Sequence, residues 1–347
     1  MLAKLRRAQV GLWAMRIAVA IVYAATSLRP HAAEVAAKPV PTVNVITFGG
    51  GYALPLWAAE RQGFFRKHGI EVKVTYTPNS VYMMKNLIEG RYDVAVSALD
   101  NMVAYQEGQG ETQVAVQPDL VAYMGFDQSF QSLMASPDNR TVADLRGKEL
   151  AVDALTTGFA FILREMVARA GMTDADVKYV RTGGGPARMR ELVARKYAAG
   201  LLATPLDLIA EEKGLKRLGT ARELLGRYQG RAAYSQRSWV RNNEATVIAF
   251  MRGYRDAMEW LYDRGNREIA AALLVANDAS MTPALARRAL DVLLDEKDGF
   301  FRDVALDLEG VKTVLALRTK FLPPAKPIED PMKYVDLDLY RKAFPAR

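Results

Sequence analysis

The sequence predicts an α/β fold with two lobes, a hinge of two crossover strands and a helical C-terminal part. Two observations lead to this prediction. Short β-rich runs alternate with helical stretches in two separate series, one within residues 43–107 and the other within residues 149–213. Strands that alternate with helices of this length form sheets of parallel strands covered on both faces. After Trp239 the pattern is almost wholly helical, which leaves no strands for a third lobe.

The first series contains three strands, each followed by a helix. Two of the helices are followed by Gly90 and Gly108, and helices commonly end at glycine because it adopts a left-handed backbone conformation. This series predicts the sheet of a first lobe. Its predicted strands are 43–48, 71–76 and 94–97, and its predicted helices are 54–61, 81–89 and 99–107.

The second series repeats this plan and predicts a second lobe. Two segments without helical periodicity, 114–135 and 230–235, flank it, and we expect them to be the crossover strands of the hinge. The first lobe is therefore expected to comprise 38–125 and 232–347, and the second lobe 126–231. The predicted strands are 149–153, 177–181 and 201–203, and the predicted helices are 159–170, 186–195 and 205–213.

The last third of the sequence predicts helices alone. Thr282 followed by Pro283 is a typical helix start, because threonine caps free N–H groups and proline is tolerated in the first turn. Since these helices have no sheet of their own, we expect them to pack on the first lobe and brace the hinge side. The predicted helices are 243–263, 267–277, 282–294 and 306–318.

The N-terminus has the order of segments typical of a signal peptide. Basic residues come first, the apolar run 17–25 follows, and small residues dominate 32–37. The apolar run is much shorter than the ~20 residues with which a helix crosses a bilayer, so a signal peptide is favoured over a membrane anchor. We expect residues 1–37 to be removed after Ala37, with Ala33 as an alternative position, and the mature protein to be exported.

Charge and composition exclude several classes of function. The formal net charge of +8 falls to +4 without residues 1–37, which hold five basic residues and one acid, so we expect no nucleic-acid partner. The chain has no cysteine, and His68 is the only histidine after the predicted leader. His68 precedes Gly69 at a predicted helix end, where a basic side chain complements the helix dipole. We therefore expect no catalytic residue, no metal and no cofactor, and hence no enzyme.

The junctions between strands and helices predict the binding site. In open α/β sheets, ligands bind beyond the carboxyl ends of the strands, where helices begin with unpaired N–H groups. Several junctions in this sequence carry glycine, hydroxyl or amide side chains. The same residue types also suit tight turns and helix caps, so both interpretations stay open. The candidate ligand-binding residues are Gly50, Gly51, Tyr52, Ser97, Asp100, Asn101, Thr156, Thr157, Gly158, Phe159, Gly184 and Thr204.

Aromatic residues near these junctions favour a small organic ligand with polar or anionic groups over a nitrate-sized ion. Some of them lie on predicted helices and also suit the lobe cores. One arginine of the second series could reach an anionic ligand from the cleft edge, although most are expected on helix surfaces. The aromatic residues are Tyr52, Trp57, Tyr123, Phe126 and Phe159, and the arginines are Arg181, Arg188, Arg190 and Arg195.

Three strings of the sequence together resemble one family. The most specific is PLWAAERQGFFRKHGIEV at 55–72, in which a Gly-Phe-Phe turn separates a helix from a strand; the others are LIEGRYDVAV at 87–96 and TVADLRGKELAV at 141–152. They are similar to the NMT1/THI5-like family of ABC transporter substrate-binding proteins, of the SsuA, nitrate and taurine type. The resemblance covers residue 43 to about residue 261. At 197–201 the chain has YAAGL where the family has Gly-x-x-Asp-Ala.

The resemblance implies the type II periplasmic binding protein fold, whose two lobes close on a ligand by hinge motion. It also implies a monomer in the periplasm that binds a small-molecule ligand of the sulfonate, nitrate, taurine or thiamine-pyrimidine class and docks on an ABC permease in the inner membrane. Two alternatives share the fold. One is an enzyme of pyrimidine-precursor biosynthesis, although this chain lacks the cysteine-rich motif of such enzymes. The other is a secreted ligand-sensing partner of a receptor.

Overall fold

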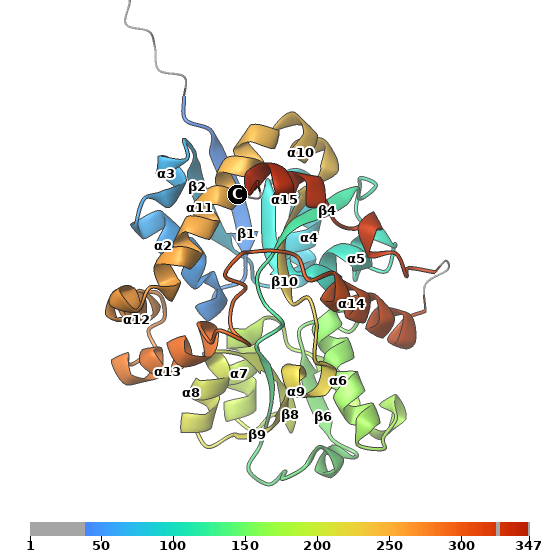
Figure 1. The fold of residues 1–347 in the computed structure, drawn as a ribbon. Coiled ribbons are helices and arrows are strands. Elements are labelled where there is room, and N and C mark those ends of the chain that lie inside the picture. The colour runs from blue at the N-terminus through green and yellow to red at the C-terminus, as the bar shows by residue number, and fades with distance from the viewer. Residues whose placement is uncertain (1–38, 324–326, 346–347) are drawn as a thin grey trace, which may run out of the picture. The chain divides into compact units, whose positions relative to one another are not determined.

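The two predicted series of strands form two five-stranded sheets (Figure 1). The structure is a computed structural model that describes residues 39–323 and 327–345. The predicted signal peptide, 1–37, lies outside the described residues. The chain from Val40 onward makes one compact unit. Within its described part, no helix combines the length and the apolar character that crossing a membrane requires.

The first sheet is mixed, whereas the sequence predicted parallel strands throughout. In sheet order its strands are β2 (Glu71–Tyr76), β1 (Thr42–Thr47), β3 (Val94–Ala98), β10 (Arg231–Gln236) and β4 (Leu120–Gly125). β1 pairs in parallel with β2 and β3, but β10 runs antiparallel to both β3 and β4. β10 comes after the whole second series, so the chain returns into this sheet from the opposite end. We call this sheet and its covering helices the first lobe.

The second sheet has the same mixed plan and defines the second lobe. In sheet order its strands are β7 (Lys178–Arg181), β6 (Glu149–Val152), β8 (Ala199–Ala203), β5 (Gln131–Ala135) and β9 (Lys216–Thr220). β6 pairs in parallel with β7 and β8, and β5 runs antiparallel to β8 and β9. The sequence did not predict β9, because this edge strand reads Lys-Arg-Leu-Gly-Thr and has no alternation of apolar and polar residues.

Most helices of the two lobes begin and end within two residues of the predicted positions. Local capping explains two of the starts: the Asn79 side chain accepts a hydrogen bond from the Tyr82 N–H at 2.8 Å, and Thr157 accepts one from the Ala160 N–H at 3.4 Å. The helices are α2 (Leu54–Arg61), α3 (Phe64–Lys67), α4 (Ser80–Ile88), α5 (Leu99–Gln106), α6 (Gly158–Arg169), α7 (Gly185–Val193), α8 (Leu206–Glu212) and α9 (Ala221–Leu225). Single 3₁₀ turns are η1 (Gly51–Ala53), η2 (Val142–Leu145), η3 (Asp174–Asp176), η4 (Arg264–Asn266) and η5 (Pro331–Lys333).

The sequence predicted that the C-terminal helices pack on the first lobe. In the structure, one of them also packs on the second lobe. They are α10 (Arg237–Asn242), α11 (Glu244–Tyr262), α12 (Arg267–Asn277), α13 (Pro283–Leu293), α14 (Leu308–Phe321) and α15 (Leu337–Ala343). α11 covers α2 and α3 of the first lobe, but α14 lies beside both α5 and α6 (Figure 1). Val311 and Leu315 of α14 are buried in the core of the first lobe, whereas Val314 and Leu317 are buried in that of the second. One helix therefore spans the two lobes.

The chain crosses between the lobes twice, from β4 to β5 and from α9 to β10. The crossings are bonded to each other: the Gly230 N–H donates to the Asp127 carbonyl at 2.8 Å, and the Phe126 N–H donates to the Arg231 carbonyl at 2.9 Å. A Cβ on Gly230 would lie 2.2 Å from Asp127 Oδ1, so a side chain does not fit there. We propose that the lobe boundaries lie in these crossings.

Candidate ligand-binding site

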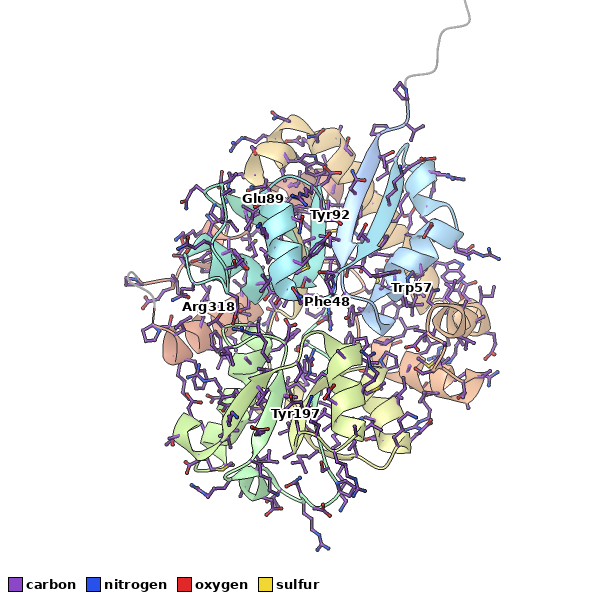
Figure 2. The ribbon with its side chains drawn as sticks, turned by 180° about the vertical axis from the view of Figure 1, so that it is seen from behind. Phe48, Trp57, Glu89, Tyr92, Tyr197 and Arg318 are labelled. Carbon is purple, nitrogen blue, oxygen red and sulfur yellow. The ribbon has the colours of Figure 1, made fainter. Side chains whose placement is uncertain are left out.

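A small cavity lies where the carboxyl ends of strands from both lobes meet. Its volume is about 40 Å³. Phe48, which follows β1, marks this position between the two lobes in Figure 2. The lining residues are Phe48, Tyr52, Ser97, Ala98, Asn101, Gln131, Asp153, Thr157, Phe159, Gly184, Gly185, Arg188, Ala203, Leu206 and Arg231.

Half of the candidate residues from the sequence line this cavity, and the other half do not. The first group contains Tyr52, Ser97, Asn101, Thr157, Phe159 and Gly184. The second group contains Gly50, Gly51, Asp100, Thr156, Gly158 and Thr204. Most members of the second group form contacts between the lobes instead. The residues at the strand ends of this chain therefore line the cavity in some cases and join the two lobes in others.

Two glycines allow the lobes to approach closely. A Cβ on Gly51 would lie 2.6 Å from Pro205 Cδ and 3.1 Å from the Thr204 carbonyl oxygen of the second lobe. A Cβ on Gly158 would lie 2.6 Å from the Asp100 Cβ of the first lobe. Because real Cβ atoms do not tolerate such distances, any larger residue at either position would keep the lobes apart.

Glu111 joins the lobes beside the cavity. It lies in the first lobe between α5 and β4, and its carboxylate accepts hydrogen bonds from the Thr156 N–H at 2.7 Å and the Thr156 hydroxyl at 3.0 Å. The same carboxylate pairs with Arg181 of the second lobe. The Glu111 side chain is only 8% exposed, so solvent screens these bonds little.

We expect Glu111→Ala to weaken ligand binding by about 3- to 30-fold, because the closed arrangement loses hydrogen bonds worth about 1–2 kcal/mol. Titration calorimetry on the wild type and the variant measures this effect. Glu107→Ala is the matched control: the Glu107 side chain is 11% exposed, and it bonds Lys333 and Tyr334 beside β4 of the same lobe. An equal loss in both variants would contradict a role in closure.

Arg231 and Tyr52 form one wall of the cavity. The Arg231 guanidinium carbon lies 3.8 Å from the centre of the Tyr52 ring, and its Nη1 donates to Asp127 Oδ2 at 3.0 Å. The charge of Arg231 is therefore compensated within the protein. Burial raises the pKa of Tyr52 to about 12, so its hydroxyl stays neutral and donates to the Gly49 carbonyl at 2.9 Å.

Arg188 of α7 is a buried cation without a carboxylate partner. Its Nε donates to the Leu201 carbonyl at 2.7 Å and its Nη1 to the Gly183 carbonyl at 2.8 Å, which fixes the orientation of the guanidinium. No described residue accepts a hydrogen bond from Nη2, and no described carboxylate forms an ion pair with this side chain. Burial lowers the pKa of Arg188. An unpaired buried charge is costly, so this position favours an anionic group of a ligand.

Two acceptor oxygens of the cavity residues are also unsatisfied. Asp153 Oδ1 and Gln131 Oε1 are buried and have no hydrogen-bond partner among the described residues. Asp153 directly follows β6, and Gln131 begins β5. Burial raises the pKa of Asp153 by disfavouring its charged form. The cavity thus contains groups that accept hydrogen bonds as well as a cation that donates them.

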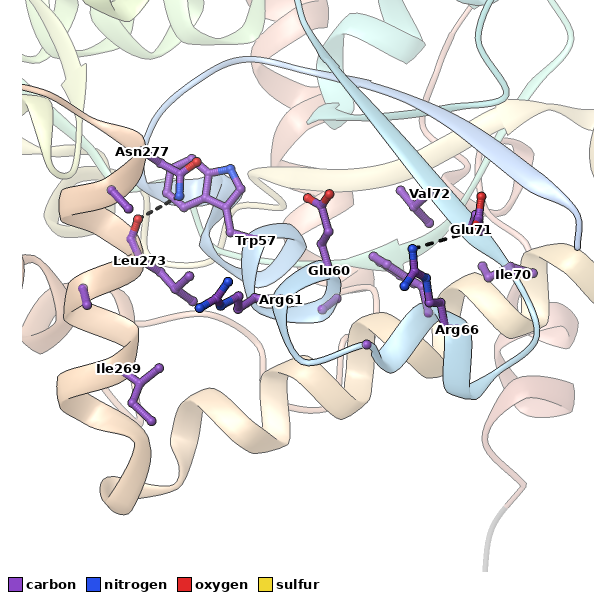
Figure 3. A pocket seen from close by; sticks show the side chains of 15 residues that line it. Trp57, Glu60, Arg61, Arg66, Ile70, Glu71, Val72, Ile269, Leu273 and Asn277 are labelled. Carbon is purple, nitrogen blue, oxygen red and sulfur yellow. Dashed lines mark hydrogen bonds and ion pairs between the residues drawn. The ribbon is translucent and has the colours of Figure 1, made fainter.

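Three aromatic residues that the sequence placed near the cleft lie elsewhere. Trp57 faces a groove between α2 and α12 (Figure 3) and lies away from Phe48 in Figure 2. Its Nε1 donates to the Tyr76 hydroxyl at 2.6 Å. Tyr123 and Phe126 are buried in the core of the first lobe. The position of each of these side chains in or next to its helix or strand directs it toward the core. A search for aromatic residues that ignores periodicity does not detect this.

His68 takes the structural position expected from the sequence. It follows the last turn of α3, and its Nε2 lies 3.0 Å from Asp256 Oδ2 of α11. Lys67 donates to the same oxygen at 2.7 Å. These contacts fasten α3 to α11, and neither His68 nor Asp256 lines the cavity.

Five polar or aromatic residues of the cavity are not among the candidate ligand-binding residues from the sequence. Arg188 appeared only among arginines expected mostly on helix surfaces. A usable signal was present for Gln131, Asp153 and Arg231, because charged or amide residues at the ends of short apolar strands are unusual unless they have a partner. The five residues are Phe48, Gln131, Asp153, Arg188 and Arg231.

Known structures share the fold. The nitrate-binding protein NrtA from Synechocystis PCC 6803 superimposes with a TM-score of 0.75 and 15% identity, covering 88% of each chain. The alkanesulfonate-binding protein SsuA from Xanthomonas axonopodis pv. citri, bound to MOPS, gives a TM-score of 0.70 at 17% identity and covers 87% of this chain and 99% of SsuA. The predicted two-lobed α/β fold of periplasmic binding proteins is therefore confirmed.

Sequence comparison leads to the same group of proteins. YtlA of Bacillus subtilis (strain 168), named as a candidate binding protein, is 21% identical over 230 residues. That match covers 63% of this chain and 65% of YtlA, so it spans less than two thirds of the relative. Residues 36–275 match the NMT1-like family, which is well over half of the 347 residues. The resemblance seen in the sequence strings is thus confirmed, and the chain belongs to the NMT1-like family.

Proposed function

We propose that this chain is an exported solute-binding protein that captures a small molecule with an anionic group between its lobes. The observation that carries the proposal is the position of Arg188, a buried cation without a carboxylate partner that lines the interlobe cavity. Delivery to an ABC permease in the inner membrane is part of the proposal. It is supported by a structure of the same fold from Staphylococcus aureus, which is described as the ligand-binding component of an ABC-type import system. The names of NrtA and SsuA, which refer to nitrate and alkanesulfonate binding, support the capture of an anionic group, and the predicted signal peptide supports a periplasmic location.

The cavity volume suggests how large the ligand is. A buried water needs about 10–15 Å³ of such volume. The cavity of about 40 Å³ therefore has room for a group of a few non-hydrogen atoms while the lobes are closed as they are here. We propose a monomer that takes a compact ligand.

The cavity suits binding better than catalysis. Its lining includes neither cysteine nor histidine. The Thr157 hydroxyl donates to the Ala154 carbonyl at 3.3 Å, and the Ser97 hydroxyl has the Asn101 amide as its neighbour at 3.5 Å. Neither hydroxyl has a basic side chain that would activate it as a nucleophile. We therefore favour a binding protein over an enzyme of pyrimidine-precursor synthesis.

A ligand screen tests the proposal. The protein without residues 1–37 is heated with nitrate, sulfonates, carboxylates, amino acids and pyrimidines in turn, and its unfolding temperature is recorded. We expect at least one compact anionic compound to raise this temperature, because a ligand at 100 times its Kd stabilises the folded state by about 2.7 kcal/mol. Stabilisation by no compound, together with turnover of one of them, would contradict the proposal.

A further inference from the structure

The cavity contains one charge of each sign that has no ion-pair partner among the described residues. The charge of Arg231 is balanced by Asp127, and that of Arg181 at the rim by Glu111. Arg188 and Asp153 remain. They attract each other across the cavity, but the structure shows no hydrogen bond or ion pair between them. A ligand with a single negative charge would satisfy Arg188 but would bring that charge toward the carboxylate of Asp153. A ligand that carries both charges would satisfy both residues.

We infer that the ligand is a small zwitterion, with its acidic group at Arg188 and a protonated amine at Asp153. This inference rests on the proposed function and specifies the substrate class of the same site. Asp153 Oδ1 and Gln131 Oε1 supply two free acceptors for the three N–H groups of an ammonium. The Tyr52 ring lies at the same cavity, where its face is already occupied by Arg231.

Arg188 cannot easily turn to meet Asp153 in place of a ligand. Two of its nitrogens are held by the carbonyls of Leu201 and Gly183, which belong to β8 and to the loop before α7. Both partners are backbone atoms of the second lobe, so rotation of the guanidinium would break two buried hydrogen bonds. The separation between the charges of Arg188 and Asp153 is therefore fixed within the second lobe. The first lobe covers both residues.

Burial also disfavours the ionised form of Asp153, as its raised pKa indicates. The contribution to stability has a definite sign: an acid whose folded pKa is raised destabilises the folded state as the pH rises from its unfolded pKa through its folded pKa. Ligand-free Asp153→Asn is therefore expected to unfold at a higher temperature than the wild type at neutral pH. When a ligand binds, an ammonium next to Asp153 would remove the free-energy cost of burying its ionised carboxylate.

Matched pairs of probes test the inference by titration calorimetry at neutral pH. β-Alanine is compared with propanoate, and taurine with ethanesulfonate, because the members of each pair differ by the amine alone. We expect the aminated member of at least one pair to bind about tenfold or more tightly, since a hydrogen bond to a charged group adds that much. Asp153→Asn should remove this preference, whereas Asp138→Asn, at an exposed position of the second lobe, should leave it unchanged.

Three outcomes have separate meanings. Equal binding of aminated and amine-free probes, unaffected by Asp153→Asn, would overturn the inference and leave the proposed function standing. Binding of amine-free anions that weakens as the pH rises and is lost in Asp153→Asn would also overturn it, because Asp153 would then donate a proton to the anion. Binding of no probe and of no compound in the wider screen would contradict the proposed function itself.

Discussion

Replacing Arg188 with methionine is expected to weaken ligand binding by about 30- to 3,000-fold, because truncating one partner of a buried, hydrogen-bonded charge pair costs about 2–5 kcal/mol. Methionine keeps most of the apolar stem of arginine but has no charge and no donor. Titration calorimetry with the tightest ligand from the screen measures the effect. The dissociation rate should account for most of it, since mutations in a contact act mainly on dissociation.

Arg190→Met is the matched control for this prediction. Arg190 lies two residues further along α7, is exposed, and makes no side-chain hydrogen bond to a described residue. Its replacement should leave affinity unchanged within about twofold, because an exposed charge at this distance is largely screened. An equal loss of affinity in both variants would indicate a general effect of charge on the lobe, and no loss in Arg188→Met would exclude the proposed anion position.

The stability of Arg188→Met must be measured alongside its affinity. Without the guanidinium, the carbonyls of Leu201 and Gly183 lose their donors, at a cost of about 1–3 kcal/mol for each buried group left unsatisfied. Arg188→Lys keeps a positive charge and one or more donors, so it should be more stable while still binding less tightly than the wild type. A folded Arg188→Lys protein with wild-type affinity would show that charge alone suffices at this position.

The sequence predicted local elements well and long-range arrangement less well. α2, β2 and α12 begin and end at the predicted residues, because helix caps, glycines and residue periodicity act within a few positions. The antiparallel direction of β5 and β10 depends on where the chain crosses between the lobes. The alternation of apolar and polar residues does not indicate the direction of a strand. For the same reason α14 was assigned to one lobe, although its alternate buried residues face two cores.

The candidate site shows the same division. Tyr52, Ser97 and Thr157 were predictable because strand ends and helix starts are local features that meet at one sheet edge. Arg188 and Asp153 were not identified as ligand contacts, because whether a charge is paired depends on residues distant in the sequence. Gly51 and Gly158 were identified as important at the correct junctions, but the structure places them where the lobes touch.

The largest expected effect on stability belongs to Arg318. This arginine of α14 is fully buried, at 0% exposure, and it joins the lobes on the side shown in Figure 2. Its Nε and Nη2 donate to the two carboxylate oxygens of Asp100 at 2.8 and 2.5 Å, and Nη2 also donates to the Thr156 carbonyl at 2.7 Å. Nη1 donates to Gln109 Oε1 at 3.0 Å. One guanidinium therefore bonds the first lobe and the second lobe at once.

We expect Arg318→Met to lower the free energy of unfolding by about 3–5 kcal/mol, because Asp100 would remain buried as an uncompensated carboxylate. Denaturation in urea, followed by circular dichroism, measures the loss. Lys312→Met is the control on the same helix: Lys312 pairs with Glu309 in solvent, and exposed pairs contribute about 0–1 kcal/mol. A loss in Arg318→Met no larger than in Lys312→Met would contradict this account.

A second replacement separates the buried charge from the packing of α14. Asp100→Asn in the Arg318→Met background removes the uncompensated carboxylate, so it should recover part of the lost stability, as coupled neighbours do. If the double variant is no more stable than Arg318→Met, the loss comes from packing against Phe161, whose ring centre lies 4.9 Å from the guanidinium carbon. Recovery would instead mean that α14 holds the two lobes together here mainly through the ion pair of Arg318 with Asp100.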